Sequence, residues 1–141
     1  MSLQGKLMRR NSMPADPLGH VQLSVSSFKT SRRFYALLFK ELGVAMVADK
    51  EKSAGWVTRE GFGIWIRQAV TSGPKQIFSA PGLHHICVKA DSRSGVDRIY
   101  ERLKRRITVS ESPRRYPQHT KDYYAVCFAD PDGMQIEVAY Y

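Results

Sequence analysis

The sequence predicts an α+β fold in which two β-α-β-β-β modules form curved mixed sheets around a cavity. Three observations support this prediction. Several segments alternate between apolar and polar residues, two longer segments have the apolar spacing of helices, and the order strand, helix, three strands occurs twice. Because one module alone leaves a sheet face uncovered, we expect both modules to pack into a single domain over residues 17–141, with modules at about 18–69 and 82–141.

The composition is that of an ordinary globular domain. The chain has 141 residues, of which 43% are hydrophobic and 25% charged, enough for a substantial core. No apolar run approaches the roughly 18 residues of a membrane span. We expect residues 1–16 to be a disordered tail, and they lack the apolar centre of a signal peptide. Cys87 and Cys127 are expected to be buried free thiols of a cytoplasmic protein.

The net charge bears on which partners the protein binds. The chain carries 22 Lys and Arg against 13 Asp and Glu, a formal charge of +9. Many basic residues fall on the two predicted helices, where they are usual on the solvated face. We find no basic stripe with base-stacking aromatic residues, so no nucleic-acid binding is predicted. The excess of positive charge favours a small anionic molecule as the partner.

The first module begins with a strand over residues 19–26, in which Val21, Leu23 and Val25 face one way. A helix follows, from an N-cap at Ser26 or Ser27 to about residue 42, where Gly43 ends it. Its apolar stripe consists of Phe28, Phe34, Tyr35, Leu38 and Leu42. Three short strands are predicted over residues 44–48, 55–58 and 62–68, with charged turns between them.

The second module follows a linker over residues 70–81 that contains three Gly or Pro residues. Its first strand covers residues 83–90, and Asp91 or Ser92 caps a helix whose stripe is Val96, Ile99, Tyr100 and Leu103. A short strand over residues 107–110 and a loop over 111–122 come next. Residues 123–140 read as a β-hairpin around Asp130-Pro131-Asp132-Gly133, a sequence that suits a type I turn.

The alternation also predicts which side chains share the cavity. The apolar side of each strand is expected to face a helix, so the opposite side lines the cavity. His20 and His85 hold equivalent places in the two modules, as do Trp65 and Glu137. His85, rather than its neighbour His84, faces the cavity because of the alternation in its strand. An inward carboxylate such as Glu137 needs a partner. The other side chains expected there are those of Gln22, Ser24, Arg67, Cys87, Lys89, Gln135 and Ala139.

Four segments carry a resemblance to a known family: Gly19-His-Val-Gln-Leu-Ser-Val, Ser31-Arg-Arg-Phe-Tyr-Ala-Leu-Leu, Gly82-Leu-His-His-Ile-Cys-Val and Tyr123-Tyr-Ala-Val-Cys-Phe-Ala-Asp-Pro-Asp-Gly-Met-Gln-Ile-Glu-Val. In them the chain resembles the vicinal oxygen chelate superfamily. This superfamily includes glyoxalase I, bleomycin-resistance proteins, methylmalonyl-CoA epimerase, fosfomycin-resistance proteins and extradiol dioxygenases. The resemblance covers residues 18–140. It implies a glyoxalase-like fold and a homodimer, and it leaves open whether one site is formed within a chain or across the dimer.

The resemblance also implies a metal site. His20, His85 and Glu137 match three family ligand positions, and Trp65 stands at the fourth, where glyoxalase I and the epimerase place a carboxylate or amide. Two histidines and one carboxylate leave open positions on a divalent ion such as Fe, Mn, Zn or Ni, as in the dioxygenases and fosfomycin transferases. Gln22 departs from the transferases, which carry Thr there. His119, Tyr123 and Tyr124, just before the last hairpin, are candidate catalytic residues.

Two functions follow from this pattern. The first is a metal-dependent enzyme, a lyase or isomerase or a ring-cleaving dioxygenase, acting on a small substrate that chelates the metal through two oxygens. The second is a metal-free binding protein of the bleomycin-resistance type, in which Glu137 pairs with Arg67 or Lys89. Trp65, Arg67, Lys89 and Gln22 would contact an anionic or aromatic ligand in either case. The loop over residues 113–119 is either a lid or an ordinary surface loop.

Overall fold

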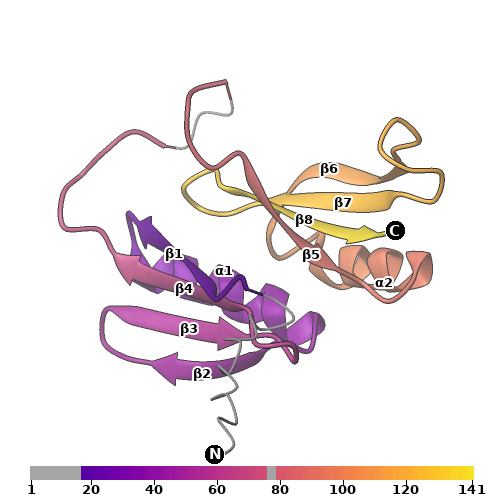
Figure 1. The fold of residues 1–141 in the computed structure, drawn as a ribbon. Helices are drawn as coiled ribbons and strands as arrows, with labels where there is room; N and C mark the ends of the chain where they lie inside the picture. Colours follow the sequence, from indigo (N-terminus) through magenta and orange to yellow (C-terminus); the bar gives the residue numbers. More distant parts are fainter. Residues whose placement is uncertain (1–16, 76–78) are drawn as a thin grey trace, which may run out of the picture.

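The computed structural model describes residues 17–75 and 79–141 and shows two four-stranded mixed sheets, each accompanied by one helix (Figure 1). The predicted tail over residues 1–16 and positions 76–78 of the linker lie outside the described residues. The elements are β1 (His20–Val25), α1 (Phe28–Glu41), β2 (Ala45–Asp49), β3 (Ser53–Val57), β4 (Gly63–Gln68), β5 (His85–Lys89), α2 (Arg93–Leu103), β6 (Thr108–Arg115), β7 (Tyr124–Ala129) and β8 (Gln135–Tyr140). The predicted α+β fold of two repeated modules is confirmed.

The two sheets have the same strand order. The first runs β1-β4-β3-β2 and the second β5-β8-β7-β6. In each, the first strand of the module pairs in parallel with the last strand, and the other pairs are antiparallel. The first strands, β1 and β5, therefore lie at the edges of their sheets, each with one hydrogen-bonded neighbour in the described part of the chain.

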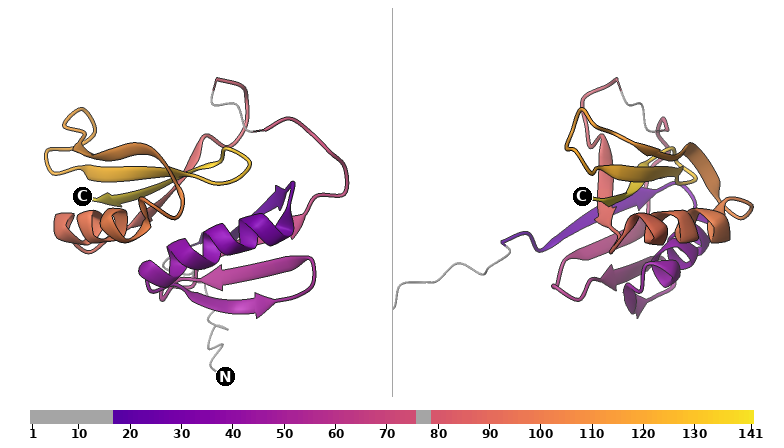
Figure 2. Two further views of the ribbon diagram at one scale, coloured as in Figure 1. Left: turned by 180° about the vertical axis from the view of Figure 1, so that it is seen from behind. Right: turned by 90° about the vertical axis from the view of Figure 1, so that its right-hand side faces the viewer.

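Each helix covers one face of its own sheet, as the view from behind shows for α1 (Figure 2). Both helices begin at a capping serine: Ser27 Oγ accepts from the backbone N–H of Thr30 at 3.4 Å, and Ser92 Oγ from that of Gly95 at 3.0 Å. The helices bring Phe34, Tyr35, Leu38, Phe39, Val96, Ile99 and Leu103 into one core that takes residues from both modules. In the part of the chain that the structure describes, neither helix is long and apolar enough to cross a membrane.

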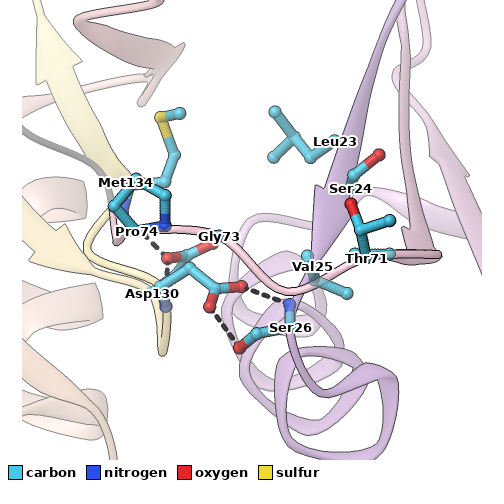
Figure 3. Close-up of a pocket in the computed structure, with 11 residues that line it drawn as sticks. Leu23, Ser24, Val25, Ser26, Thr71, Gly73, Pro74, Asp130 and Met134 are labelled. Carbon is cyan, nitrogen blue, oxygen red and sulfur yellow. Dashed lines mark hydrogen bonds between the residues drawn. The ribbon is translucent and has the colours of Figure 1, made fainter.

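The Asp130–Gly133 turn joins the second module to the first (Figure 3). Gly133 donates its N–H to the carbonyl oxygen of Asp130 at 2.9 Å, the hydrogen bond that closes the predicted turn, and its φ of 85° is one that glycine adopts readily. The Tyr35 hydroxyl on α1 donates to Asp130 Oδ2 at 2.7 Å, and Ser26 donates its N–H to Asp132 Oδ2 at 2.9 Å. Burial raises the pKa of Asp130, which is 5% exposed, and the hydrogen bonds that its carboxylate accepts from Tyr35 and from the N–H groups of Met134 and Asp132 oppose the rise.

Two expectations are corrected. The strand predicted over residues 107–110 runs on to Arg115, so residues 111–115 of the predicted loop 111–122 belong to strand β6. Its register with β7 shifts between Val109 and Glu111 and again before Arg114, and these irregularities interrupt the alternation that marks a strand in sequence. Cys127 is half-buried, but Cys87 is exposed rather than buried; both are free thiols, as predicted.

Candidate functional site

The face of each sheet that its helix leaves uncovered is here called the open face, and it carries the polar side chains of the strands. Along β1 and β5 the polar positions are exposed and the intervening apolar ones are more buried, as the alternation predicts. The parallel ladders place Gln22 beside Trp65 and Cys87 beside Glu137. The pairing therefore repeats between the modules, and Trp65 and Glu137 hold equivalent positions on the two open faces.

The second open face holds a histidine and a carboxylate in contact. Glu137 is 8% exposed, and its Oε2 lies 3.3 Å from Nε2 of His85, which is exposed. The Nδ1 atoms of His85 and His84 are 2.8 Å apart, close enough for one to donate to the other. In the described part of the chain, the ion-pair partner of Glu137 is thus a histidine, and not Arg67 or Lys89 as the metal-free alternative assumed.

Two thiols flank Glu137 in the same row of the sheet, Cys87 on β5 and Cys127 on β7. Loss of water around the thiol, together with the charge of Glu137, raises the pKa of Cys87 to about 11. The same two causes raise the pKa of Cys127 to about 12. Both groups are therefore protonated thiols at neutral pH and are poor nucleophiles there.

An aromatic cluster lies at the end of this open face where β5 and β8 finish, and it consists of Tyr116, His119, Tyr123 and Tyr141. The rings of Tyr123 and Tyr141 stack with their centres 4.7 Å apart and their planes 7° apart. The centre of the His119 ring lies 5.8 Å from that of Tyr116 and 5.2 Å from that of Tyr123. The Tyr123 hydroxyl lies 3.9 Å from Cys87 Sγ, and burial together with nearby Cys87 and Glu137 raises its pKa. Lys89 Nζ lies 4.2 Å from the centre of the Tyr141 ring.

The first open face holds a cavity of ≈ 580 Å³. Its lining includes Gln22, Trp65 and Arg67, three of the residues predicted to contact substrate, together with Lys52 and Ser53. Gln22 and Arg67 are exposed, and Trp65 is half-buried. His20 lies at the start of the same face, paired with Gly63 in the β1–β4 ladder.

The structure groups some of the predicted site residues and separates others. His85, Glu137, Tyr123, His119 and Lys89 belong to the second open face, and His20, Gln22, Trp65 and Arg67 to the first. Within residues 17–75 and 79–141 no three His, Cys, Asp or Glu side chains come together as a metal site, so His20 does not join His85 and Glu137 inside one chain.

Tyr124 is not part of this group. Its hydroxyl donates to Asp97 Oδ1 on α2 at 2.6 Å, on the helix-covered side of the sheet. Sequence reasoning considered Tyr116 only as part of the 113–119 loop and left out Cys127 and Tyr141 as site residues. The alternation of β7 pointed to Cys127, since its neighbours Val126 and Phe128 are fully buried, whereas nothing local marked Tyr141.

Comparison with known proteins agrees with this architecture. Among curated proteins, the chain is 31% identical over 127 residues to the uncharacterized protein YqjT of Bacillus subtilis, covering 84% of this chain and 94% of that protein. It is 26% identical over 140 residues to the virulence protein STM3117 of Salmonella typhimurium, covering 99% and 94%.

Solved structures show the same fold. A glyoxalase/bleomycin resistance protein from Albidiferax ferrireducens superposes with a TM-score of 0.72 at 18% identity, over 89% of this chain and 100% of that one. A lactoylglutathione lyase from Agrobacterium tumefaciens superposes with a TM-score of 0.62 at 22% identity, over 89% and 94%. The family model described as Glyoxalase/Bleomycin resistance protein/Dioxygenase superfamily matches residues 17–138. With two repeated modules and a match over nearly the whole described chain, the protein belongs to the glyoxalase/bleomycin resistance protein/dioxygenase superfamily.

Proposed function

We propose that the protein is a divalent-metal-dependent enzyme acting on a small substrate that offers two neighbouring oxygens, as a lyase or isomerase or as a ring-cleaving dioxygenase. The observation that carries the proposal is the contact between Glu137 and His85 on the second open face. The carboxylate oxygen and the imidazole nitrogen lie 3.3 Å apart, and both are atoms that ligate divalent metals in proteins.

The residues present fit a metal ion. Glu137 is nearly buried, and in the described part of the chain no Lys or Arg forms an ion pair with it. A carboxylate that has been taken out of water is stabilised by a nearby positive charge. A divalent cation bound by His20, His85 and Glu137 would supply the missing positive charge, and imidazole with carboxylate suits Fe, Mn, Zn or Ni.

The third ligand, in this proposal, comes from a second copy of the chain. His20 lies on a different sheet from His85 and Glu137, and both β1 and β5 are edge strands. Exposed edge strands readily add another strand. A two-fold homodimer that sets β1 of one copy beside β5 of the other would bring the first open face of one chain next to the second open face of its partner.

Several side chains of this protein then have assignable roles. The bound metal would act as a Lewis acid toward the chelating oxygens of the substrate. Arg67 and Lys89 would hold an anionic group, and Gln22 would orient a polar one. Because its pKa is raised, Tyr123 keeps its proton and would donate a hydrogen bond to a substrate oxygen beside Glu137. His119, which stacks on Tyr116, would support Tyr123.

The second candidate is a metal-free binding protein of the bleomycin-resistance type. The aromatic rings on both open faces favour it, because Trp65 and the aromatic cluster offer flat apolar surface beside cationic side chains. In either case we expect a small-molecule partner rather than nucleic acid. The free, partly accessible Cys87 supports a reducing, cytoplasmic location.

Metal content separates the two functions. We expect protein purified without a His tag or chelators to hold about one Fe, Mn, Zn or Ni per chain, and the double variant His85→Ala, Glu137→Ala to lose it. Tyr124→Phe, which removes a hydroxyl that contacts Asp97 on the helix-covered side, is the control and should keep the metal. Elemental analysis after reconstitution is the measurement. Unchanged metal content in the double variant, or no metal in wild type at all, would leave the binding protein as the better description.

A further inference from the structure

The indole of Trp65 lies flat on the first open face, over two glycines. A Cβ built on Gly55, its neighbour on β3, would come within 2.4 Å of Trp65 Cε3 and 2.6 Å of Cδ2 and Cζ3. A Cβ on Gly63 would come within 3.0 Å of Trp65 Nε1. The six-membered ring therefore lies over Gly55 and the pyrrole edge over Gly63, with the ring plane resting on the sheet.

These glycines supply space rather than an unusual backbone shape. Neither is among the four described glycines with positive φ, so an alanine would be compatible with the backbone at both positions. An alanine at position 55 would instead displace the indole from its position over the sheet, because its Cβ would occupy the space of the ring. The arrangement keeps Trp65 from filling the cavity and leaves the other side of its ring half-exposed, whereas Trp56, on the helix-covered side, is 2% exposed.

The cavity above this ring is polar and basic at its edges. Arg67 lies two residues along β4 on the same open face, and Lys52 is the second cation in the lining; among the described residues, no Asp or Glu contributes to it. Arg67 is exposed, and within residues 17–75 and 79–141 it forms no ion pair with an acidic side chain. A guanidinium beside a flat aromatic surface recognises a carboxylate attached to a planar ring.

The platform is next to His20. The same Cβ on Gly63 that would meet Trp65 Nε1 would also lie 3.0 Å from the Cβ of His20, so the indole edge and the histidine flank one spot on the sheet. A ring stacked on Trp65 would therefore have its edge close to the side chain that the proposed function assigns to the metal.

We propose that Trp65, seated on Gly55 and Gly63, is the stacking platform for the substrate, and that the substrate is a planar aromatic carboxylate whose acid group binds Arg67. This inference names the substrate class of the site under Proposed function and rests on that proposal only for the reaction. Binding to the platform itself needs the first open face, and not the metal.

The test uses full-length protein treated with chelator and a probe that binds metals poorly, 2-naphthoate. Cyclohexanecarboxylate, which has the acid group but no flat ring, and 2-naphthamide, which has the ring but no charge, are the matched probes. Calorimetry gives affinities, and the two indole N–H signals in ¹H–¹⁵N spectra report where the probe binds, because the chain has only two tryptophans. We expect naphthoate to bind more tightly than either probe and to shift the Trp65 signal while the Trp56 signal stays in place.

Variants sharpen the test. Trp65→Ala and Gly55→Ala should weaken naphthoate binding about tenfold or more, as expected for losing a stacking surface, and Arg67→Gln should remove the preference over naphthamide. Gly73→Ala is the control, since a Cβ there meets nothing within 4 Å. Trp65→Ala keeps the test decisive if Gly55→Ala fails to fold.

Three results would overturn the inference: no binding of naphthoate, equal binding of cyclohexanecarboxylate, or affinity that Trp65→Ala leaves unchanged. The outcome is separable from that of the proposed function. Naphthoate binding tests the platform, and the double variant His85→Ala, Glu137→Ala should keep it even if the metal site has been misassigned. Metal uptake tests the proposed function, and Gly55→Ala should keep it even if the platform has been misassigned.

Discussion

The hydroxyl of Tyr35 is held inside the protein by one carboxylate. Tyr35 is fully buried, and its hydroxyl donates to Asp130 Oδ2 at 2.7 Å. The other oxygen of Asp130 accepts the backbone N–H groups of Asp132 at 2.9 Å and Met134 at 2.8 Å. The pair ties the first helix to the turn of the last hairpin, so it connects residues 95 positions apart.

Removing this hydroxyl should weaken the protein. Tyr35→Phe leaves Asp130 Oδ2 buried without its donor, and such a loss costs about 1–3 kcal/mol. We expect urea unfolding to show a lower midpoint with an unchanged slope. Tyr124→Phe, which removes a hydrogen bond to the exposed Asp97, is the control and should cost less. Equal losses of stability in the two variants would mean that the buried hydrogen bond to Asp130 contributes no more than the exposed one to Asp97.

The same tyrosine predicts a dependence on alkaline pH. Burial raises the pKa of Tyr35 well above its ordinary value, and the charges of Asp130 and Asp132 add to the rise. The folded protein therefore keeps this proton where the unfolded chain, with a pKa of about 10, releases it. The free energy of unfolding falls as the pH rises above that value, by at most about 1.4 kcal/mol per pH unit for one group.

Comparison with Tyr35→Phe isolates this contribution. The variant lacks the group, so the stability difference between wild type and Tyr35→Phe should be constant from about pH 7 to 9 and should shrink between about pH 10 and 11. Urea titrations at each pH measure it. A difference that stays constant through pH 11 would contradict the assignment of the raised pKa to Tyr35.

The two helices show how a single side chain starts an element. Ser92 Oγ accepts the N–H of Gly95 at 3.0 Å, a well-formed cap, whereas Ser27 Oγ lies 3.4 Å from the N–H of Thr30. The sequence left two neighbouring candidates for each cap, Ser26 or Ser27 and Asp91 or Ser92, and the structure selects Ser27 and Ser92. The unequal lengths of the two contacts were not predictable from sequence, because they depend on how each helix rests on its sheet.

The cap lengths predict unequal effects. Ser92→Ala should lower the free energy of unfolding by about 1 kcal/mol, and Ser27→Ala by less. Chemical unfolding of the two variants beside wild type measures this. An equal or larger loss for Ser27→Ala would show that the longer contact is no weaker a cap.

At the scale of the whole molecule, one chain presents two open faces, each with half of the proposed site. The faces belong to separate sheets whose first strands, β1 and β5, are both edges. If a second copy completes each site, two chains that lack different ligands can together form one complete site. His20→Ala lacks one contribution and His85→Ala the other.

Mixing these two variants tests the shared site. When His20→Ala and His85→Ala are co-expressed in equal amounts, about half of the dimers are mixed, and each mixed dimer has one site with all three ligands, so about a quarter of all sites should bind metal. Each variant alone should bind none. Light scattering should give the mass of a dimer for both. A metal-free mixture of dimers would contradict a site shared between chains.

Sequence alone determined the two modules, the helix-facing and open sides of the strands, and the correspondence of His20 with His85 and of Trp65 with Glu137, because these follow from local periodicity and from repetition. Tertiary structure alone decided which side chains meet. It paired Glu137 with His85, turned Tyr124 toward α2, kept His20 on a separate sheet and laid Trp65 across Gly55. The physical reason is that alternation sets the direction of a side chain, whereas its neighbours depend on strand register and on how sheets pack, which residues distant in sequence settle together.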